Sequence, residues 1–99
     1  MEEVDNIIAF KGEELTIHLH KYAIGHNNRL DLVDSMGMPI ITATTNVEHI
    51  DLEENEVLIK DYGENEGILK AFKKAGIISN VTERITQGHV TLYICDLLI

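Results

Sequence analysis

The chain has 99 residues, 44% of them hydrophobic, with a single cysteine and a formal net charge of −9. This length and apolar content predict one folded domain over residues 1–99 and exclude a disordered chain. The single cysteine excludes a disulfide framework within the chain. The acidic balance weighs against direct nucleic-acid binding, which requires neutralised phosphates. No apolar run approaches the ~20 residues of a membrane span and Met1-Glu2-Glu3 opens no signal peptide, so we expect a cytoplasmic protein that does not enter membranes.

The first half of the chain alternates apolar and polar residues, which is typical of half-buried strands. For example, Leu15, Ile17 and Leu19 would share one face of a strand, with polar residues on the other. Turn-forming residues at 25–28 and 35–37 would separate successive strands. The strands expected here, which together form an antiparallel meander, are 6–10, 15–20, 29–34 and 38–47.

The second half predicts an acidic loop over 48–55 and then three further elements. The segment 56–60 is apolar and β-branched, and 89–94 alternates again, so both are predicted strands. Between them, apolar residues at helical spacing predict one amphipathic helix over about 64–75. This order predicts an α+β domain, in which one helix packs on one face of a single antiparallel sheet that includes a C-terminal strand.

The ends of the predicted helix carry their own signals. Gly76 is expected to end it, because glycine readily adopts the left-handed conformation found there. Asp61 and Asn65 are both candidates for the N-cap, and the sequence leaves that choice open. Gly67 disfavours a helix by about 1 kcal/mol relative to alanine, and it predicts either close packing or a later helix start.

The negative charge is concentrated in the segment 48–66, which carries a net −7 because Lys60 is its single basic residue. Such a surface repels nucleic acid and attracts basic partners, and spaced carboxylates can imitate a phosphate backbone. The alternative interpretation is a solvated loop that keeps a small protein soluble. The predicted partner-binding residues are the eight carboxylates of this segment: Glu48, Asp51, Glu53, Glu54, Glu56, Asp61, Glu64 and Glu66.

The histidines and the cysteine are the other candidates for chemistry. His18 and His20 would share one strand face and could supply two ligands to a transition metal, with His49 or His89 as a third. Whether these histidines converge is left open. Cys95 would be a nucleophile only with a lowered pKa, and free cysteine is most often a small buried hydrophobe. Since no CxxC or HExxH motif is present, we predict no catalytic residue, no metal site and no cofactor.

A family-like pattern runs through much of the chain. Its segments are 12–15 (GEEL), 41–47 (ITATTNV), 56–69 (EVLIKDYGENEGIL), 75–78 (AGII), 88–90 (GHV) and 95–97 (CDL). The pattern resembles an uncharacterised family of small proteins from phages and integrative elements of Gram-positive and gut bacteria. The resemblance implies an accessory protein of a mobile element that acts in a bacterial cytoplasm, and the family has no assigned activity to carry over.

The leading hypothesis is a non-enzymatic binding protein of a phage or mobile element, whose acidic face engages a basic surface of a host protein such as a defence nuclease. One alternative is an oligomeric sponge for a small ligand such as a signalling nucleotide. The residues that would contact that ligand are Lys11, Tyr22, Arg29 and Arg84. A further alternative is a small metal-dependent or thiol hydrolase built on His18, His20 and Cys95. The choice between monomer and homodimer is left open.

Overall fold

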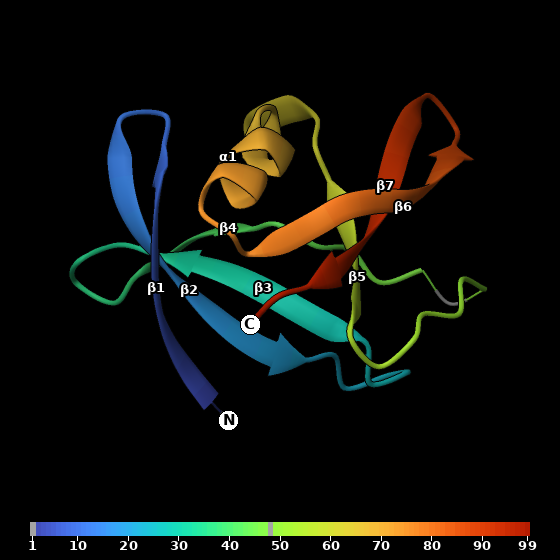
Figure 1. Cartoon of the computed structure of the whole chain (residues 1–99), viewed down its shortest axis with the longest axis horizontal. Coiled ribbons are helices and arrows are strands. Elements are labelled where there is room, and N and C mark those ends of the chain that lie inside the picture. The colour runs from blue at the N-terminus through green and yellow to red at the C-terminus, as the bar shows by residue number, and fades with distance from the viewer. Residues whose placement is uncertain (1, 48) are drawn as a thin grey trace.

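The computed structural model describes residues 2–47 and 49–99, and for residues 2–6 it describes the backbone alone (Figure 1). Its elements, in chain order, are β1 (Glu2–Phe10), β2 (Glu13–Lys21), β3 (Asn28–Val33), β4 (Pro39–Thr42), β5 (Glu56–Lys60), a 3₁₀ turn η1 (Gly63–Asn65), α1 (Ile68–Lys74), β6 (Ile78–Gln87) and β7 (Val90–Leu97). The protein is therefore α+β, mostly antiparallel sheet with a short helix, as the sequence predicts.

The first sheet is a meander in the order β1-β2-β3-β4, and each pair of neighbours is antiparallel. Lys11 and Gly12 form the turn between β1 and β2 with φ angles of 50° and 80°. Positive φ at both central residues matches the twist of a tight hairpin. The predicted order of these strands is confirmed, but the fourth strand, predicted over 38–47, is shorter because β4 ends at Thr42.

The second sheet has the order β5-β7-β6, so the prediction of a single sheet is wrong. The residues after β4 join the two sheets by pairing with a strand of each. The N–H of Ala43 donates to the carbonyl of Leu30 in β3 at 2.9 Å, and the carbonyl of Ala43 accepts from the N–H of Lys60 in β5 at 3.0 Å. Thr44 then bridges Ile59 in antiparallel fashion. This junction fixes where β5, and the acidic residues on either side of it, lie relative to the first sheet.

The strand β6 was not predicted from the sequence. Its apolar residues Ile78, Val81 and Ile85 are separated by two and then three other residues, and its register against β7 shifts on both sides of Val81. Such irregularities remove the period-two alternation that identifies a strand. The closing strand predicted over 89–94 is also corrected, because His89 lies in the turn between β6 and β7.

The helix α1 is shorter than the predicted helix over 64–75. Gly67, with a φ of 95°, precedes α1 directly, and η1 takes up the residues where the helix was expected to begin. Of the two roles predicted for Gly67, the later helix start is the one observed. Gly76 ends the helix as predicted, with a φ of 75°. The N–H of Ile77 then donates to the carbonyl of Phe72 at 2.9 Å, which satisfies one of the last carbonyls of the helix.

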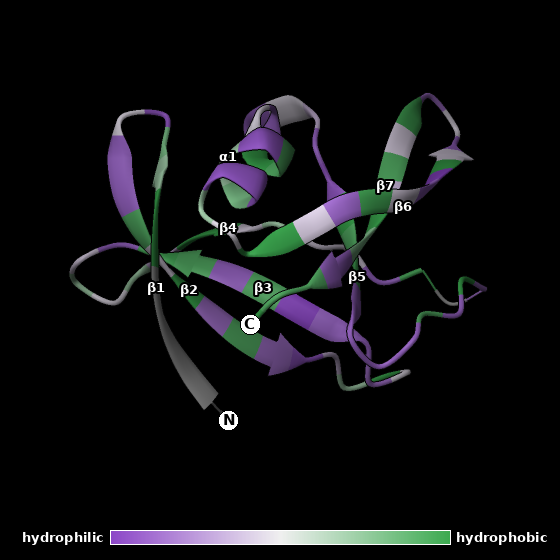
Figure 2. Cartoon of the chain, viewed as in Figure 1, coloured by the Kyte–Doolittle hydropathy of each residue, from purple (hydrophilic) through white to green (hydrophobic). Residues whose placement is uncertain are grey.

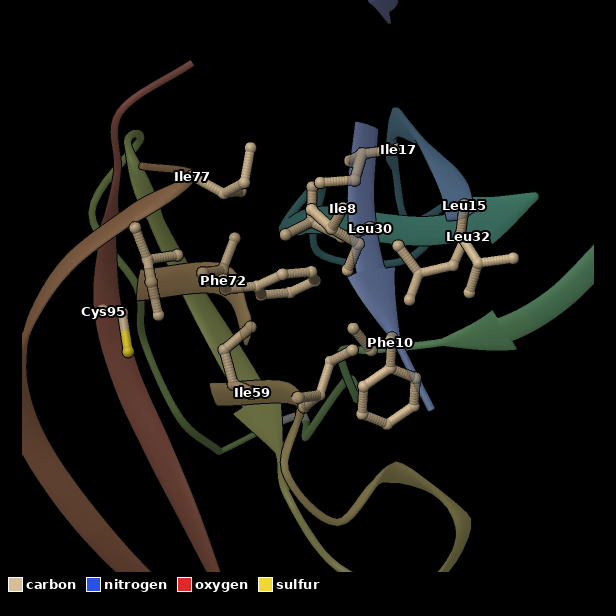
Figure 3. Packing of buried hydrophobic residues seen from close by; sticks show 14 residues of the cluster. Ile8, Phe10, Leu15, Ile17, Leu30, Leu32, Ile59, Phe72, Ile77 and Cys95 are labelled. Atoms are coloured by element: carbon tan, nitrogen blue, oxygen red, sulfur yellow. The ribbon is translucent and has the colours of Figure 1, made fainter. Parts of the chain in front are cut away.

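The main core lies between the two sheets and α1, and it is aliphatic apart from two phenylalanines (Figure 3). Apolar and polar residues alternate along β2 and β3, so one face of the first sheet enters this core (Figure 2). Phe72 points from α1 toward these strands, and Ile59 of β5 lies beside it. A smaller cluster on the other face of the second sheet consists of Leu58, Leu92 and Ile94.

Candidate partner-binding surface

Apart from Glu56, the first residue of β5, the predicted acidic residues fall into two groups, one before β5 and one after it; Figure 1 shows where β5 lies. Asp51, Glu53 and Glu54 form the first group, and their side chains are exposed. We call the segment 49–55 that carries them the acidic loop. Glu48, also predicted as a partner-binding residue, lies outside the described residues.

Two of the predicted residues, at the ends of β5, make hydrogen bonds that hold the backbone. The carboxylate of Glu56 accepts from the N–H of Glu53 at 2.8 Å. The carboxylate of Asp61 accepts from the N–H of Gly67 at 3.0 Å and from the N–H of Leu69 at 2.8 Å. The N-cap residue of α1 is Gly67, so neither predicted N-cap, Asp61 or Asn65, occupies that position. The Asp61 carboxylate nevertheless caps the first turn of α1 from outside the helix. A carboxylate engaged in this way has less capacity to bind a partner.

The acidic residues after β5 lie among lysines. The ammonium of Lys11 donates to the backbone carbonyl of Glu64 at 2.7 Å. Glu66 lines a shallow hollow together with Lys11, Lys70 and Lys74. Because opposite charges within a Debye length offset each other, the negative potential at this end of β5 is weakened. In the acidic loop, by contrast, the carboxylates face solvent and fewer basic side chains lie near them to offset their charge.

Apolar side chains anchor the acidic loop to the outer face of the second sheet. Ile50 and Leu52 of the loop pack there together with Val47, which precedes the loop. The strand residues of this cluster are Leu58, Leu92, Ile94 and Ile85. Asp51 stands between two of these anchors and is exposed. The loop therefore presents its carboxylates from a backbone that is held in place, unlike a solvated tail.

Asparagine side chains tie this loop region to the first sheet. Asn28, at the start of β3, is only 4% exposed, and its amide donates to the carbonyls of Glu54 at 2.8 Å and Glu56 at 3.0 Å. The amide of Asn46 donates to the carbonyl of Ile24 at 2.9 Å. These bonds satisfy backbone carbonyls and limit the motion of the loop relative to the turn before β3.

Sequence analysis missed both kinds of anchor. Asn28 was read only as a turn residue, because its burial depends on a loop that lies more than 20 positions away. The docking of the loop did leave a signal: Ile50, Asp51, Leu52 and Glu53 alternate between apolar and acidic. Period-two alternation indicates a segment with one buried side, even where no strand forms.

A polar cluster lies on the solvent face of the first sheet. The carboxylate of Asp31 accepts from the Nε of Arg29 at 3.0 Å and from the hydroxyl of Thr42 at 2.8 Å. The Nε2 of His20 lies 3.7 Å from the same carboxylate. The guanidinium of Arg29 is 5.7 Å from the centroid of the Tyr22 ring, within the range of a cation–π contact.

The four residues predicted to contact a small ligand do not meet in one place within this chain. Arg29 and Tyr22 lie together, as described above. Lys11 lies in the turn between β1 and β2, and Arg84 lies on β6 above the ring of Tyr93. A site that used all four would need residues from more than one copy of the chain.

The four histidines considered as metal ligands lie on three different parts of the fold. His18 and His20 are on β2 with ring centroids 6.2 Å apart, His49 is in the acidic loop, and His89 is in the turn between β6 and β7. In the described part of the chain, no group of three or more histidine, cysteine, aspartate or glutamate side chains is placed to hold a metal ion.

Cys95 lies on β7 and is fully buried in the main core. Burial raises the pKa of its thiol to about 11, while the charge of Lys73 lowers it and that of Asp96 raises it. At neutral pH the thiol is therefore protonated, and a protonated thiol is a poor nucleophile. A thiol that is both protonated and buried does not favour the thiol-hydrolase alternative.

Among residues 2–47 and 49–99, no helix has the length and apolar character needed to cross a membrane. The chain matches no protein-family model, no curated protein and no solved structure at a significant level. Functional interpretation therefore depends on the residues and the geometry described above.

Proposed function

We propose that the protein is a non-enzymatic binding protein, and that its acidic loop engages a basic surface of another protein. The observation that carries this proposal is the state of Asp51, Glu53 and Glu54. All three are exposed, and their carboxylates make no ion pair or hydrogen bond with the other described residues. Three acidic groups held on an anchored loop leave a local negative potential with no internal partner.

The physical consequence of this arrangement is attraction of cationic surfaces. Complementary charge raises association rates and suppresses binding to acidic partners. The same charges repel phosphate, so the partner is expected to be a protein rather than a nucleic acid. Because the charges are exposed, salt should weaken the interaction, with a screening length of about 8–10 Å at ordinary ionic strength.

The class of partner that fits best is a protein whose basic groove normally binds nucleic acid, such as a host defence nuclease. Carboxylates spaced along a loop can occupy such a groove in place of phosphates. A phage or mobile-element origin and a bacterial cytoplasmic location form part of this proposal. Both are supported by the sequence resemblance alone.

The test compares two variants of equal net charge. The first neutralises the acidic loop through Asp51→Asn, Glu53→Gln and Glu54→Gln. The second neutralises three exposed carboxylates on other strands through Glu13→Gln, Glu14→Gln and Glu83→Gln. Each variant changes the formal net charge from −9 to −6, so a difference between them reports on position rather than total charge.

Each protein is immobilised and exposed to bacterial lysate at low salt, then washed at about 1 M salt, where the screening length is about 3 Å. We expect the wild type and the control variant to retain the same protein at low salt and to release it at high salt. The loop variant should not retain it. Equal retention by the two variants would exclude the acidic loop as the binding surface.

A small anionic ligand bound on the solvent face of the first sheet is a second candidate function. It is favoured by the contact between Arg29 and Tyr22, because an arginine stacked on an aromatic ring leaves other guanidinium N–H groups to bind phosphate. Thermal shift assays against a panel of nucleotides would test it. Stabilisation that survives Arg29→Lys would argue against this role for the guanidinium.

A further inference from the structure

The acidic loop borders a hollow whose lining combines apolar side chains with polar ones, Asn27 and Asn46 among them. This hollow, of about 160 Å³, lies between the turn before β3 and the acidic loop, and Ile24, Val47, Ile50 and Leu52 line it together with Asp51. Ile24, on the wall of this hollow, is 68% exposed, so its side chain is accessible to a partner. A volume of about 150 Å³ is enough to hold a benzene-sized group. The hollow therefore has room for one aliphatic side chain of a partner.

A wider hollow continues from the first. It has a volume of about 510 Å³, shares Leu52 with the smaller hollow, and is lined by Glu53, Glu54 and Lys21. Two carboxylates and one ammonium give this region a net negative charge. Apolar contact is therefore available in the smaller hollow, and cationic side chains would be attracted to the wider one beside it.

Hydrogen bonds hold the walls of the smaller hollow together. The amide of Asn46 donates to the carbonyl of Ile24, and the amide of Asn27 donates to the carboxamide oxygen of Asn46 at 3.3 Å. The walls belong to segments about 20 residues apart in the sequence, so these bonds set the width of the hollow. A site that is formed before binding loses less conformational entropy when a ligand enters.

We propose that this pair of hollows binds a protein segment in which one aliphatic side chain is flanked by lysine or arginine. The aliphatic side chain enters the hollow beside Ile24, and the flanking cations face Asp51, Glu53 and Glu54. This proposal rests on the proposed function and deepens it, because it names the local chemistry of the partner. Burial of an apolar anchor supplies affinity, and the surrounding charges supply selectivity and association rate.

The acidic surroundings disfavour anionic occupants. Nucleic acid and anionic lipid headgroups both carry phosphate, which the three carboxylates repel. An acidic peptide is repelled for the same reason. A neutral apolar peptide would gain the anchor contact but not the attraction from the loop, so it should bind less tightly than the basic segment.

The experiment is an NMR titration of the isotope-labelled full chain with three blocked five-residue peptides. The first has leucine between two pairs of lysines, the second has serine in place of the leucine, and the third has leucine between two pairs of glutamates. We expect the lysine–leucine peptide to bind about tenfold or more tightly than the lysine–serine peptide, as the burial of one aliphatic side chain predicts. Its shifts should fall on residues 22–27 and 46–56, and the glutamate peptide should not bind.

Two single substitutions separate the anchor contact from general surface hydrophobicity. Ile24→Ser should reduce the affinity for the lysine–leucine peptide to that of the lysine–serine peptide. Met36→Ser removes an apolar side chain that is 85% exposed in the turn between β3 and β4, and it should change neither affinity. Because both side chains are exposed, neither change should prevent folding.

The outcomes distinguish this inference from the proposed function. If both lysine peptides bind equally and Ile24→Ser has no effect, the anchor hollow is excluded while the acidic loop remains a cation-binding surface. If neither lysine peptide binds more tightly to the wild type than to the variant with Asp51→Asn, Glu53→Gln and Glu54→Gln, both proposals are excluded. Shifts that fall outside the two segments would also overturn the inference.

Discussion

The carboxylate of Asp61 and the N–H of Leu69 are joined by a 2.8 Å hydrogen bond across eight positions of the chain. The N–H of Gly67, the N-cap residue, donates to the other carboxylate oxygen, so Asp61 caps the first turn of α1 although residues 62–67 separate it from the helix. A carboxylate at a helix N-terminus also interacts favourably with the helix dipole. One residue that the charge pattern assigned to a partner surface thus has a structural role.

We therefore predict that Asp61→Ala lowers the free energy of unfolding by about 1–2 kcal/mol, because two backbone N–H groups lose their acceptor. Urea denaturation followed by circular dichroism measures the change in midpoint at constant slope. Glu64→Gln, in the exposed 3₁₀ turn, is the control and should shift stability by less than about 0.5 kcal/mol. Equal effects of the two substitutions would show that Asp61 is not the cap.

The second prediction is that the hydrogen bonds of Asn28 hold the acidic loop in place. Asn28→Ala removes the donor for the carbonyls of Glu54 and Glu56, and it should cost about 1–3 kcal/mol because two partly buried acceptors lose their partner. Amide hydrogen exchange should quicken in residues 49–56 more than in β2. Asn80→Ala, at an exposed position of β6, is the matched control. Unchanged exchange in the loop would contradict the role of Asn28.

The parts of the fold that the sequence predicts well are those determined by neighbouring residues. β2, β3 and β5 follow from alternation or from a short β-branched run, and Gly76 ends α1 because its conformation is a local property. The concentration of acidic residues around β5 can also be read directly from the sequence. These features need no knowledge of what the segment packs against.

The parts that could not be predicted depend on contacts between distant segments. β6 is irregular because its register shifts against β7, and Asp61 reaches the first turn of α1 only because a 3₁₀ turn lies between them. The acidic loop is anchored by strands of the second sheet, whose existence the sequence analysis had not recognised. Two of the three strands that form this surface, β5 and β7, were predicted, but their pairing in a separate second sheet was not.

Because Cys95 is buried, we predict that the stability of the protein falls as the pH rises through the alkaline range. Burial raises the pKa of its thiol from 9.0 to about 11, so the unfolded chain releases this proton at a lower pH than the folded protein. The resulting stabilisation is fully present below about pH 9 and is lost as the pH rises toward 11. The difference of two pKa units corresponds to about 2–3 kcal/mol.

Urea denaturation of the wild type and of Cys95→Ala between about pH 8 and pH 11 checks this prediction. The substitution should cost about 1 kcal/mol of packing near neutral pH. Tyr22, whose pKa burial also raises, is present in both proteins, so the comparison isolates the thiol. Parallel stability curves for the two proteins would contradict the assignment of this loss to Cys95.

The last prediction is that the three carboxylates of the acidic loop contribute nothing to stability. Asp51→Asn, Glu53→Gln and Glu54→Gln together remove mutual repulsion and break no ion pair among the described residues, so the variant should be as stable as the wild type or up to about 1 kcal/mol more stable. Glu56→Gln is the contrast, because it weakens a hydrogen bond to the N–H of Glu53, and it should cost about 0.5–1 kcal/mol. Thermal and urea unfolding measure the stability of both variants.

A triple variant less stable than Glu56→Gln would mean that the charges of the acidic loop hold the loop in place. The proposal that these charges face a partner would then be contradicted. A triple variant that keeps its stability and loses its partner would show that these charges serve binding rather than folding.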